Sequence, residues 1–345
     1  MIHQRIAPII AIMLLSHVCC CAHPSTPRED RGRSSARVNA RLPRGFRLPP
    51  PQKISLRGKG ILIELFSAGF AQGQAVYLEL SRHPAALKGE FSVRAVSFNT
   101  VAVPVTRREW GYRGIFGIDP ESHPAVKKLQ VVYAVDGIIL TERFDVTVRK
   151  SVFQYYPTPL DLGKYSDVEY RLTKSEVDFI NRCSARKHTV FNRTGPDRLG
   201  DGLAHPRDQH LITSPFWSRR VIMRYKIRHG KKIRQKDMPN VHKGIDLRGK
   251  TGDPVYCMAD GRVVLAEPMY YEGNFIVVDH GNRFFTYYMH LSGFSVREGD
   301  AVRAGDRIGR VGSTGLSTAS HLHVSARVRD VEVDPLSILV LPLRR

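Results

Sequence analysis

Cysteine is scarce in this chain beyond its first residues. Of the five cysteines among 345 residues, three stand together at Cys19, Cys20 and Cys21. The other two, Cys183 and Cys257, are isolated, and neither belongs to a Cys-x-x-Cys pair, which argues against a thiolate metal site. They could form one disulfide in an oxidising compartment, although isolated thiols more often serve as small buried apolar residues.

The chain also lacks a hydrophobic run long enough to cross a bilayer. The segment from Ile6 to Val18 is apolar apart from three residues, and it is shorter than the ~20 residues that a spanning helix needs. With Arg5 before it, the run is typical of an export signal. Residues 1–22 are therefore predicted to be a signal peptide.

The residues after this run leave two modes of export open. A cysteine directly after the apolar run suggests a lipoprotein anchored through Cys19, Cys20 or Cys21, but Ser16-His17-Val18-Cys19 is a poor lipobox. Ala22, with Cys20 two residues before it, also suits ordinary cleavage. Either route predicts a protein of the periplasm or cell envelope, and lipid anchoring is slightly favoured over free secretion.

Acidic residues are too few to balance the basic ones. The chain has 53 Lys and Arg against 32 Asp and Glu, a formal net charge of +21, which favours polyanionic partners. For an exported chain these are anionic cell-envelope polymers and lipid head groups, although a generally basic, solvated surface would look the same. Nucleic acid is not expected, because the basic run Arg228–Lys236 has no interleaved aromatic residues for base stacking. Walker and dinucleotide motifs are also missing.

Four regions follow the predicted signal peptide. Residues 23–52 are rich in Arg, Pro and Ser and are expected to be a disordered tether. Residues 53–150 carry short β-prone runs between turn signals, which is typical of an antiparallel β-sandwich of about 100 residues. This accessory domain has no plausible catalytic group, so a spacer or wall-binding role is expected. Residues 151–210 are a connector, and residues 211–341 return to a β pattern.

One helix is expected in the connector. Helical periodicity runs from Thr173 to Cys183, and Thr173 with Glu176 forms a capping-box pattern. The predicted fold class is therefore mainly β, with a single helical connector between two β-rich domains.

Chemistry-bearing residues gather in the C-terminal region at five positions, which are His242, Asp246, His290, His321 and His323. Histidine and carboxylate are ligands that zinc favours, and a catalytic zinc site keeps one position for water. His321 and His323 alternate within a β-type run, so both imidazoles are expected on one face. The segment from His242 to Asp246 is predicted to be a loop that enters a strand.

A series of motifs in this region resembles the lysostaphin-type, LytM-like zinc endopeptidases of metallopeptidase family 23. The stretch His242-Lys243-Gly244-Ile245-Asp246 matches the H-x-G-x-D signature. The resemblance covers roughly residues 211–340 in order, through these further blocks: Gly252-Asp253-Pro254-Val255, Ala259-Asp260-Gly261, Gly273 to Gly281, Tyr288-Met289-His290-Leu291-Ser292, Val296 to Val302, Gly309 to Gly315, His321-Leu322-His323 and Val333-Asp334-Pro335.

The resemblance implies roles for the five residues. His242, Asp246 and His323 would bind one zinc ion, and His290 and His321 would be catalytic histidines beside it, with the base not distinguished. Zinc lowers the pKa of bound water to ~7, so the implied activity is hydrolysis of peptide cross-links in bacterial peptidoglycan by a metal-activated water. The alternative is a catalytically silent LytM-like wall-binding protein or amidase activator.

Two features depart from the family pattern, and a third resembles another class of protein. Val324 and Ser325 follow His323 where relatives often have an aromatic residue and an acid, and the basic segment Arg224–Lys236 is longer than usual; both bear on substrate preference. The glycine-rich segment 298–312 resembles the hairpin of lipoyl and biotinyl carriers. No lysine occupies a tip position in it, which argues against carrier function.

Overall fold

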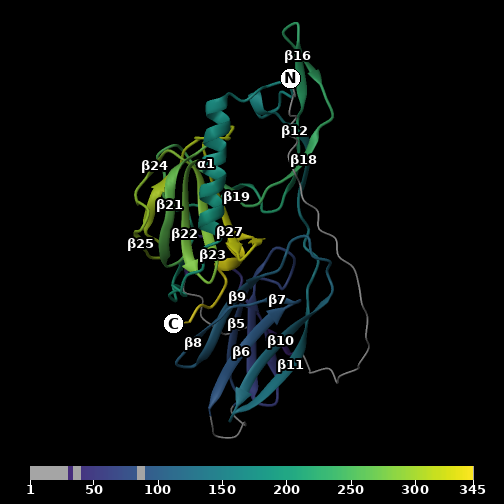
Figure 1. The fold of residues 1–345 in the computed structure, drawn as a ribbon, viewed down its shortest axis with the longest axis vertical. Helices are drawn as coiled ribbons and strands as arrows, with labels where there is room; N and C mark the ends of the chain where they lie inside the picture. Colours follow the sequence, from purple (N-terminus) through teal and green to yellow (C-terminus); the bar gives the residue numbers. More distant parts are fainter. Residues whose placement is uncertain (1–29, 34–39, 84–89, 345) are drawn as a thin grey trace.

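The structure is a computed structural model that describes residues 30–33, 40–83 and 90–344. Strands dominate it and most pair antiparallel (Figure 1), which confirms the predicted mainly β fold class. The predicted signal peptide, with the cysteines proposed for lipid attachment, lies outside the described residues. Within the described part, no helix combines the length and apolar character needed to cross a membrane.

Residues 52 to 147 form a sandwich of two sheets, and β1 joins one of these sheets at its edge. One sheet has the order β1 (Asp30–Arg33), β3 (Gln52–Arg57), β4 (Ile61–Ser67), β5 (Ala75–Arg82), β9 (Gly111–Gly117) and β8 (Val105–Arg108). The other has the order β11 (Ile138–Thr147), β10 (Val126–Val135), β6 (Phe91–Phe98) and β7 (Val101–Ala102). Alternate residues such as Ile61, Ile63 and Leu65 are fully buried between the sheets, as the period of two in a strand requires.

Parts of the region expected to be a disordered tether are paired. Strand β1 lies antiparallel to β3, and β2 (Ala40–Arg41) lies parallel to β13 (Leu203–Ala204). Leu42 and Leu48 pack against the core of the C-terminal domain. The structure differs from the expectation here because β3 and β13 offer backbone groups for this Arg- and Pro-rich segment to pair with, and its two leucines add apolar contacts.

The connector contains the expected helix, α1 (Lys174–Phe191), after β12 (Tyr155–Leu160) and a short 3-10 turn, η1 (Gly163–Tyr165). The capping box is present, because Thr173 accepts from the Glu176 backbone N–H and Glu176 accepts from that of Thr173. The helix runs eight residues past the expected end at Cys183 because Val190 and Phe191 continue its apolar contact with the C-terminal sheet.

An eight-stranded sheet forms the centre of the C-terminal domain. Its order is β14 (Ile212–Ser214), β19 (Ile245–Arg248), β27 (His321–Val328), β23 (Phe284–Leu291), β22 (Gly273–Gly281), β21 (Gly261–Met269) and β25 (Ala301–Val302), with β28 (Val331–Val333) paired to β27. Helix α1 covers one face, and a small sheet of β20 (Pro254–Tyr256), β26 (Arg307–Arg310) and β24 (Gly293–Phe294) covers the other. Cys183 and Cys257 are buried and free, in different apolar clusters.

The segment that resembles a lipoyl-type hairpin is not a two-stranded hairpin. Strand β25 pairs with β21 in the large sheet, whereas β26 pairs with β20 and β24 in the small sheet. The glycine-rich turn between them, with Gly305 at φ 85°, therefore joins two layers. A resemblance carried by turn residues could not distinguish these two arrangements.

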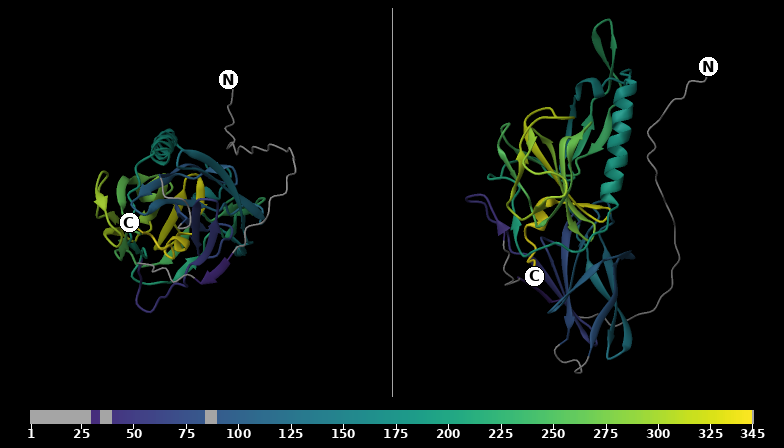
Figure 2. Two further views of the ribbon diagram at one scale, coloured as in Figure 1. Left: turned by 90° about the horizontal axis from the view of Figure 1, so that it is seen from below. Right: turned by 60° about the vertical axis from the view of Figure 1, so that its left-hand side comes forward.

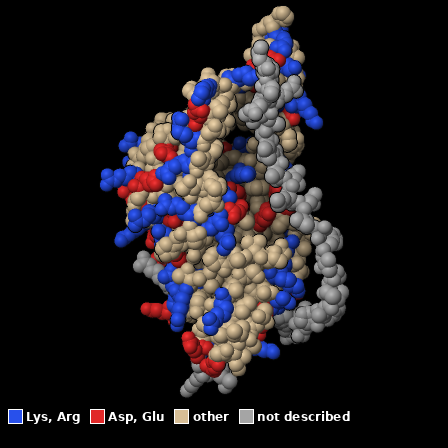
Figure 3. Space-filling view, in the orientation of Figure 1, with Lys and Arg blue, Asp and Glu red and all other residues tan. Residues whose placement is uncertain are grey.

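An arm extends from the C-terminal domain. It consists of a three-stranded sheet, β12, β15 (Arg219–Ile222) and β18 (Met238–Val241), and a projecting hairpin of β16 (Tyr225–Arg228) and β17 (Lys231–Arg234) (Figure 1). All four residues of β17 are exposed. Basic side chains lie along the hairpin, as Figure 3 shows.

The sandwich and the C-terminal domain are stacked along the long axis of the molecule (Figure 2). One apolar cluster runs through both, joining Phe66 and Tyr77 of the sandwich to Val333 and Ile338. After β28, the short helix α2 (Pro335–Ile338) meets the sandwich, where the Ala75 backbone N–H donates to Ser337 Oγ at 3.0 Å. The two domains thus share a continuous core.

Candidate metal centre

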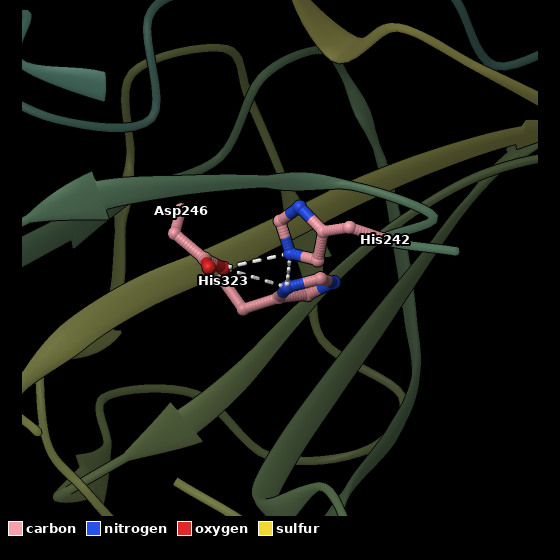
Figure 4. A group of neighbouring side chains, drawn as sticks. All are labelled: His242, Asp246 and His323. Atoms are coloured by element: carbon pink, nitrogen blue, oxygen red, sulfur yellow. Dashed lines mark hydrogen bonds and ion pairs between the residues drawn. The ribbon is translucent and has the colours of Figure 1, made fainter. Parts of the chain in front are cut away.

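Three side chains from the H-x-G-x-D segment and β27 meet at one point. His242 Nε2, Asp246 Oδ1 and His323 Nδ1 lie 2.9 Å from one another in all three pairs (Figure 4). All three residues are at most 9% exposed. Within the described part of the chain, this is the group of His, Cys, Asp and Glu side chains that could hold a metal ion.

Two strands and one loop bring these residues together. Strands β19 and β27 are antiparallel neighbours, and their register places Asp246 directly opposite His323. His242 precedes β19, as expected for a loop that enters a strand. Its backbone is fixed on both sides, because its N–H donates to Ser218 O and its carbonyl accepts from the Trp217 N–H.

Gly244 is required between His242 and Asp246 because the chain passes very close to β27 there. A Cβ at this position would lie 2.3 Å from Ser325 Oγ and 2.4 Å from the Val324 carbonyl oxygen, closer than non-bonded atoms approach. The glycine of the H-x-G-x-D signature therefore sets the contact between the loop and the strand that carries His323.

The hydrogen bonds around the two imidazoles suit a cation. His242 Nδ1 lies 3.1 Å from the Pro215 carbonyl oxygen, which can only accept, so Nδ1 carries the proton and Nε2 presents a lone pair. His323 Nε2 lies 2.9 Å from Ser325 Oγ, and donation to that oxygen leaves Nδ1 with the lone pair. Two nitrogen lone pairs and a carboxylate oxygen then converge, and a metal ion would stabilise this arrangement. The hydrogen bonds to the Pro215 carbonyl and to Ser325 Oγ orient the two imidazoles for it.

The donor set also fits zinc in type and number. Two imidazole nitrogens and one carboxylate oxygen are a common three-ligand set for a catalytic zinc ion. A tetrahedral ion with ligands at about 2.0–2.2 Å needs donor atoms about 3.3–3.6 Å apart. The observed 2.9 Å triangle therefore needs to widen by about 0.4–0.7 Å to hold the ion.

Electrostatics keep the ligand atoms in the protonation states that metal binding needs. Burial raises the pKa of Asp246, but the imidazoles of His242 and His323, which donate to it when protonated, outweigh burial and hold the pKa well below its usual range. Burial lowers the pKa of His323. At neutral pH the site therefore holds a carboxylate beside a neutral His323.

His290 is placed beside this centre by a bulge in β23. Between the Asn274–Leu291 and Ile276–Tyr288 pairs, one residue of β22 lies opposite two of β23. His290, one of these two, has φ 62°, a conformation that non-glycine residues rarely adopt. Bulges of this kind re-aim a side chain. The His290 ring lies 5.1 Å from that of His321 and 6.1 Å from that of His323, between centroids.

His290 and His321 are held in the same way. Each Nδ1 faces a backbone carbonyl, that of Thr314 at 2.9 Å for His290 and that of Ala319 at 2.7 Å for His321. Each Nε2 is therefore the unprotonated nitrogen of the neutral ring, and that of His321 lies 3.5 Å from Asp246 Oδ1. Burial lowers the pKa of His290 to about 4, so this imidazole is neutral at pH 7.

All five residues singled out from the sequence thus lie in one place. His321 and His323 face the centre while Leu322 and Val324 are fully buried in the core, as strand alternation predicts. Arg220 was missed. Its Nη2 donates to Asp246 Oδ2 at 3.1 Å and to Ser214 Oγ, but a single arginine in a basic segment carries no motif, and only the register of β15 places it here.

The fold and the converging donor atoms define a β-sheet domain with a three-residue site that could hold a metal ion. Residues 240–335 match the family described as Peptidase family M23, so the chain carries an M23 metallopeptidase domain, and the resemblance predicted from the motifs is confirmed.

Curated relatives match the C-terminal part of the chain. The chain is 34% identical over 140 residues to peptidoglycan DD-endopeptidase ShyA of Vibrio cholerae, covering 41% of this chain and 31% of that protein. It is 44% identical over 98 residues to DD-carboxypeptidase/endopeptidase Mpg of Neisseria meningitidis, covering 28% of this chain and 23% of that protein. The chain thus spans less than a third of the length of either relative.

A solved structure shares more of the fold. A crystal structure from Pseudomonas aeruginosa assigned to peptidase M23 matches with a TM-score of 0.51 and 23% identity, covering 79% of this chain and 96% of that chain. A match of this extent includes more than the C-terminal domain, so the likeness in fold extends beyond residues 211–341.

Proposed function

We propose that this protein is an exported zinc-dependent endopeptidase that hydrolyses peptide cross-links in bacterial peptidoglycan. The observation that carries the proposal is the convergence of His242 Nε2, Asp246 Oδ1 and His323 Nδ1 within an M23 domain. The DD-endopeptidase names of its relatives support peptidoglycan as the substrate.

The proposed chemistry divides the work between a bound ion and two histidines. Zinc held by His242, Asp246 and His323 would supply an activated water and polarise the scissile carbonyl. His290 and His321 each present an Nε2 lone pair beside the ligands. These nitrogens can accept a proton as water attacks and return it to the leaving amine. Their Nδ1–H groups, fixed on backbone carbonyls, keep the rings oriented for this exchange.

Export and contact with an anionic envelope surface belong to the same proposal. The apolar leader supports export, with lipid attachment at Cys19, Cys20 or Cys21 as the favoured mode. The hairpin of β16 and β17 supports the surface contact, because Arg228, Lys231 and Lys232 are exposed on it. Some of its charge is offset by pairs such as Arg228 with Glu169. The remaining positive charge favours an anionic partner.

Digestion of purified peptidoglycan tests the proposal. The full chain with one equivalent of zinc should convert cross-linked muropeptides into monomers detected by mass spectrometry. His323→Ala should release none, whereas His188→Ala, a change at an exposed histidine of α1, should behave as wild type. If the zinc-loaded protein cleaved no peptidoglycan type, the silent wall-binding or amidase-activating alternative would replace this reading.

A further inference from the structure

Some peptidoglycan cross-links join two amino-acid centres of D configuration, called D-centres here. The amide bond between two D-centres has a neighbouring functional group that other peptide bridges lack. The nitrogen of its scissile amide is attached to a carbon that also bears a free carboxyl group. A glycine bridge has no anion at this place. The carboxylate carbon is three covalent bonds from the scissile carbonyl carbon, and so at most about 4 Å from it. An enzyme selective for this bond needs a fixed cation directly beside its reacting centre.

Arg220 supplies such a cation. It lies on β15, and its Nη2 donates to Asp246 Oδ2, the carboxylate oxygen that faces away from the two imidazoles, at 3.1 Å. A second bond from the same nitrogen to Ser214 Oγ fixes the group. The guanidinium is therefore held by hydrogen bonds directly beside a proposed ligand of the metal.

The guanidinium retains donors for a second anion. Among the described residues, the side-chain hydrogen bonds of Arg220 all use Nη2. Its side chain keeps 21% of its surface exposed, against 13% for Asp246. An arginine presents five N–H donors in a planar fork that matches carboxylate geometry, so binding Asp246 leaves Nε and Nη1 to donate.

The charge of the site favours an incoming carboxylate. Arg220 already neutralises Asp246, and the other two proposed ligands, His242 and His323, bind a metal ion as neutral imidazoles. The two positive charges of a bound divalent ion are then left uncompensated. A substrate anion entering beside Arg220 would meet a net positive centre rather than a balanced one.

We propose that Arg220 binds the free carboxylate next to the scissile amide and thereby makes this site selective for cross-links between D-centres. This rests on the proposed endopeptidase function and adds a specificity-determining residue to it. Arg219 is the matched control, because it precedes Arg220 on the same strand, is exposed, and points to the opposite face.

The test uses two synthetic cross-linked dimers that differ at one group. In one, the carboxyl beside the scissile amide is free; in the other it is the carboxamide. We expect wild type to favour the free acid by about 10- to 100-fold in kcat/KM, as a charge-assisted hydrogen bond gives. Arg220→Gln should reduce this ratio below about 3-fold, Arg220→Lys should give an intermediate ratio, and Arg219→Gln should leave it unchanged.

The ratio separates substrate recognition from damage to the metal centre. Lost zinc lowers the rates on both dimers alike and leaves their ratio intact, and the zinc content of each variant is measured in parallel. The dissociation constants of the two dimers are also compared in the His290→Ala background, where cleavage should be blocked. There the preference should again disappear with Arg220→Gln.

Two results would overturn the role of Arg220: no preference for the free acid in wild type, or an unchanged preference in Arg220→Gln. Failure of the endopeptidase function would look different, because neither dimer would be cleaved. The ratio of dissociation constants would then decide the role of Arg220 by itself.

Discussion

Replacing Arg113 by methionine should loosen the joint between the two domains. Arg113 lies on β9 of the sandwich with a side chain only 1% exposed. Its guanidinium donates to both carboxylate oxygens of Asp197 at 2.8 and 2.9 Å, and to the carbonyl oxygens of Arg344 and Leu199. It thus connects the sandwich to the segment after α1 and to the C-terminus.

The magnitude follows from what the substitution leaves behind. Breaking a buried ion pair costs about 3–5 kcal/mol, because the remaining charge stays buried without its partner. Asp197 has a side chain 4% exposed but keeps Arg108 at 3.0 Å, so the lower end applies. We expect Arg113→Met to lower the free energy of unfolding by about 3 kcal/mol, and the melting temperature by about 4–6 °C.

Thermal and urea unfolding of the full chain measure this loss. Arg94→Met, at an exposed position of β6, is the control and should change the melting temperature little. Peptidase activity at low temperature should stay near that of wild type, because Arg113 is remote from the metal centre. If the melting temperature of Arg113→Met fell no further than that of the control, the buried pair would not hold the domains together.

Three further outcomes follow from particular contacts. Gly244→Ala should reduce zinc affinity about 10- to 100-fold in a chelator competition, because the added Cβ displaces β27 from the loop. Burial raises the pKa of Asp334 from 3.8 to about 6, so the folded protein binds a proton more tightly than the unfolded chain. The stability of the fold should therefore fall as pH rises from about 4 to about 6. Asp334→Asn should flatten that part of the plot of melting temperature against pH. Replacing Lys226 and Lys231 of the hairpin by glutamine should weaken cosedimentation with purified cell walls at low salt and leave it unchanged at high salt.

Each of these outcomes has a control and a contrary result. Gly293→Ala should keep full zinc affinity, since a Cβ there meets no atom within 4 Å; equal affinity in both glycine variants would refute the close-contact argument. A melting-temperature profile as steep in Asp334→Asn as in wild type would assign the pH dependence to another group. Wall binding reduced equally by Lys174→Gln, on an exposed lysine of α1, would show that general charge rather than the hairpin governs it.

The residues of the site were accessible from the sequence because their spacing has local causes. Leu322 between His321 and His323 enforces strand alternation, and Gly244 permits the close passage between His242 and β27. The capping box likewise identified the start of α1, since Thr173 and Glu176 satisfy each other's backbone groups within one turn.

What the sequence did not predict depends on contacts between distant segments. Val190 continues α1 because it packs against the C-terminal sheet, and Leu42 orders part of the expected tether by joining the same domain's core. Arg220 reaches Asp246 only through the pairing of β15 with β18 within the arm. None of these contacts leaves a periodic or motif-like trace in the chain.

Anomalous diffraction at the zinc edge from crystals of the full chain tests the central claim most directly. The account predicts one strong peak bounded by His242 Nε2, Asp246 Oδ1 and His323 Nδ1, each at about 2.0–2.2 Å, and no peak in His323→Ala crystals grown with the same zinc. A zinc-soaked wild-type crystal with no ion among these three atoms, or with its zinc bound elsewhere, would contradict it.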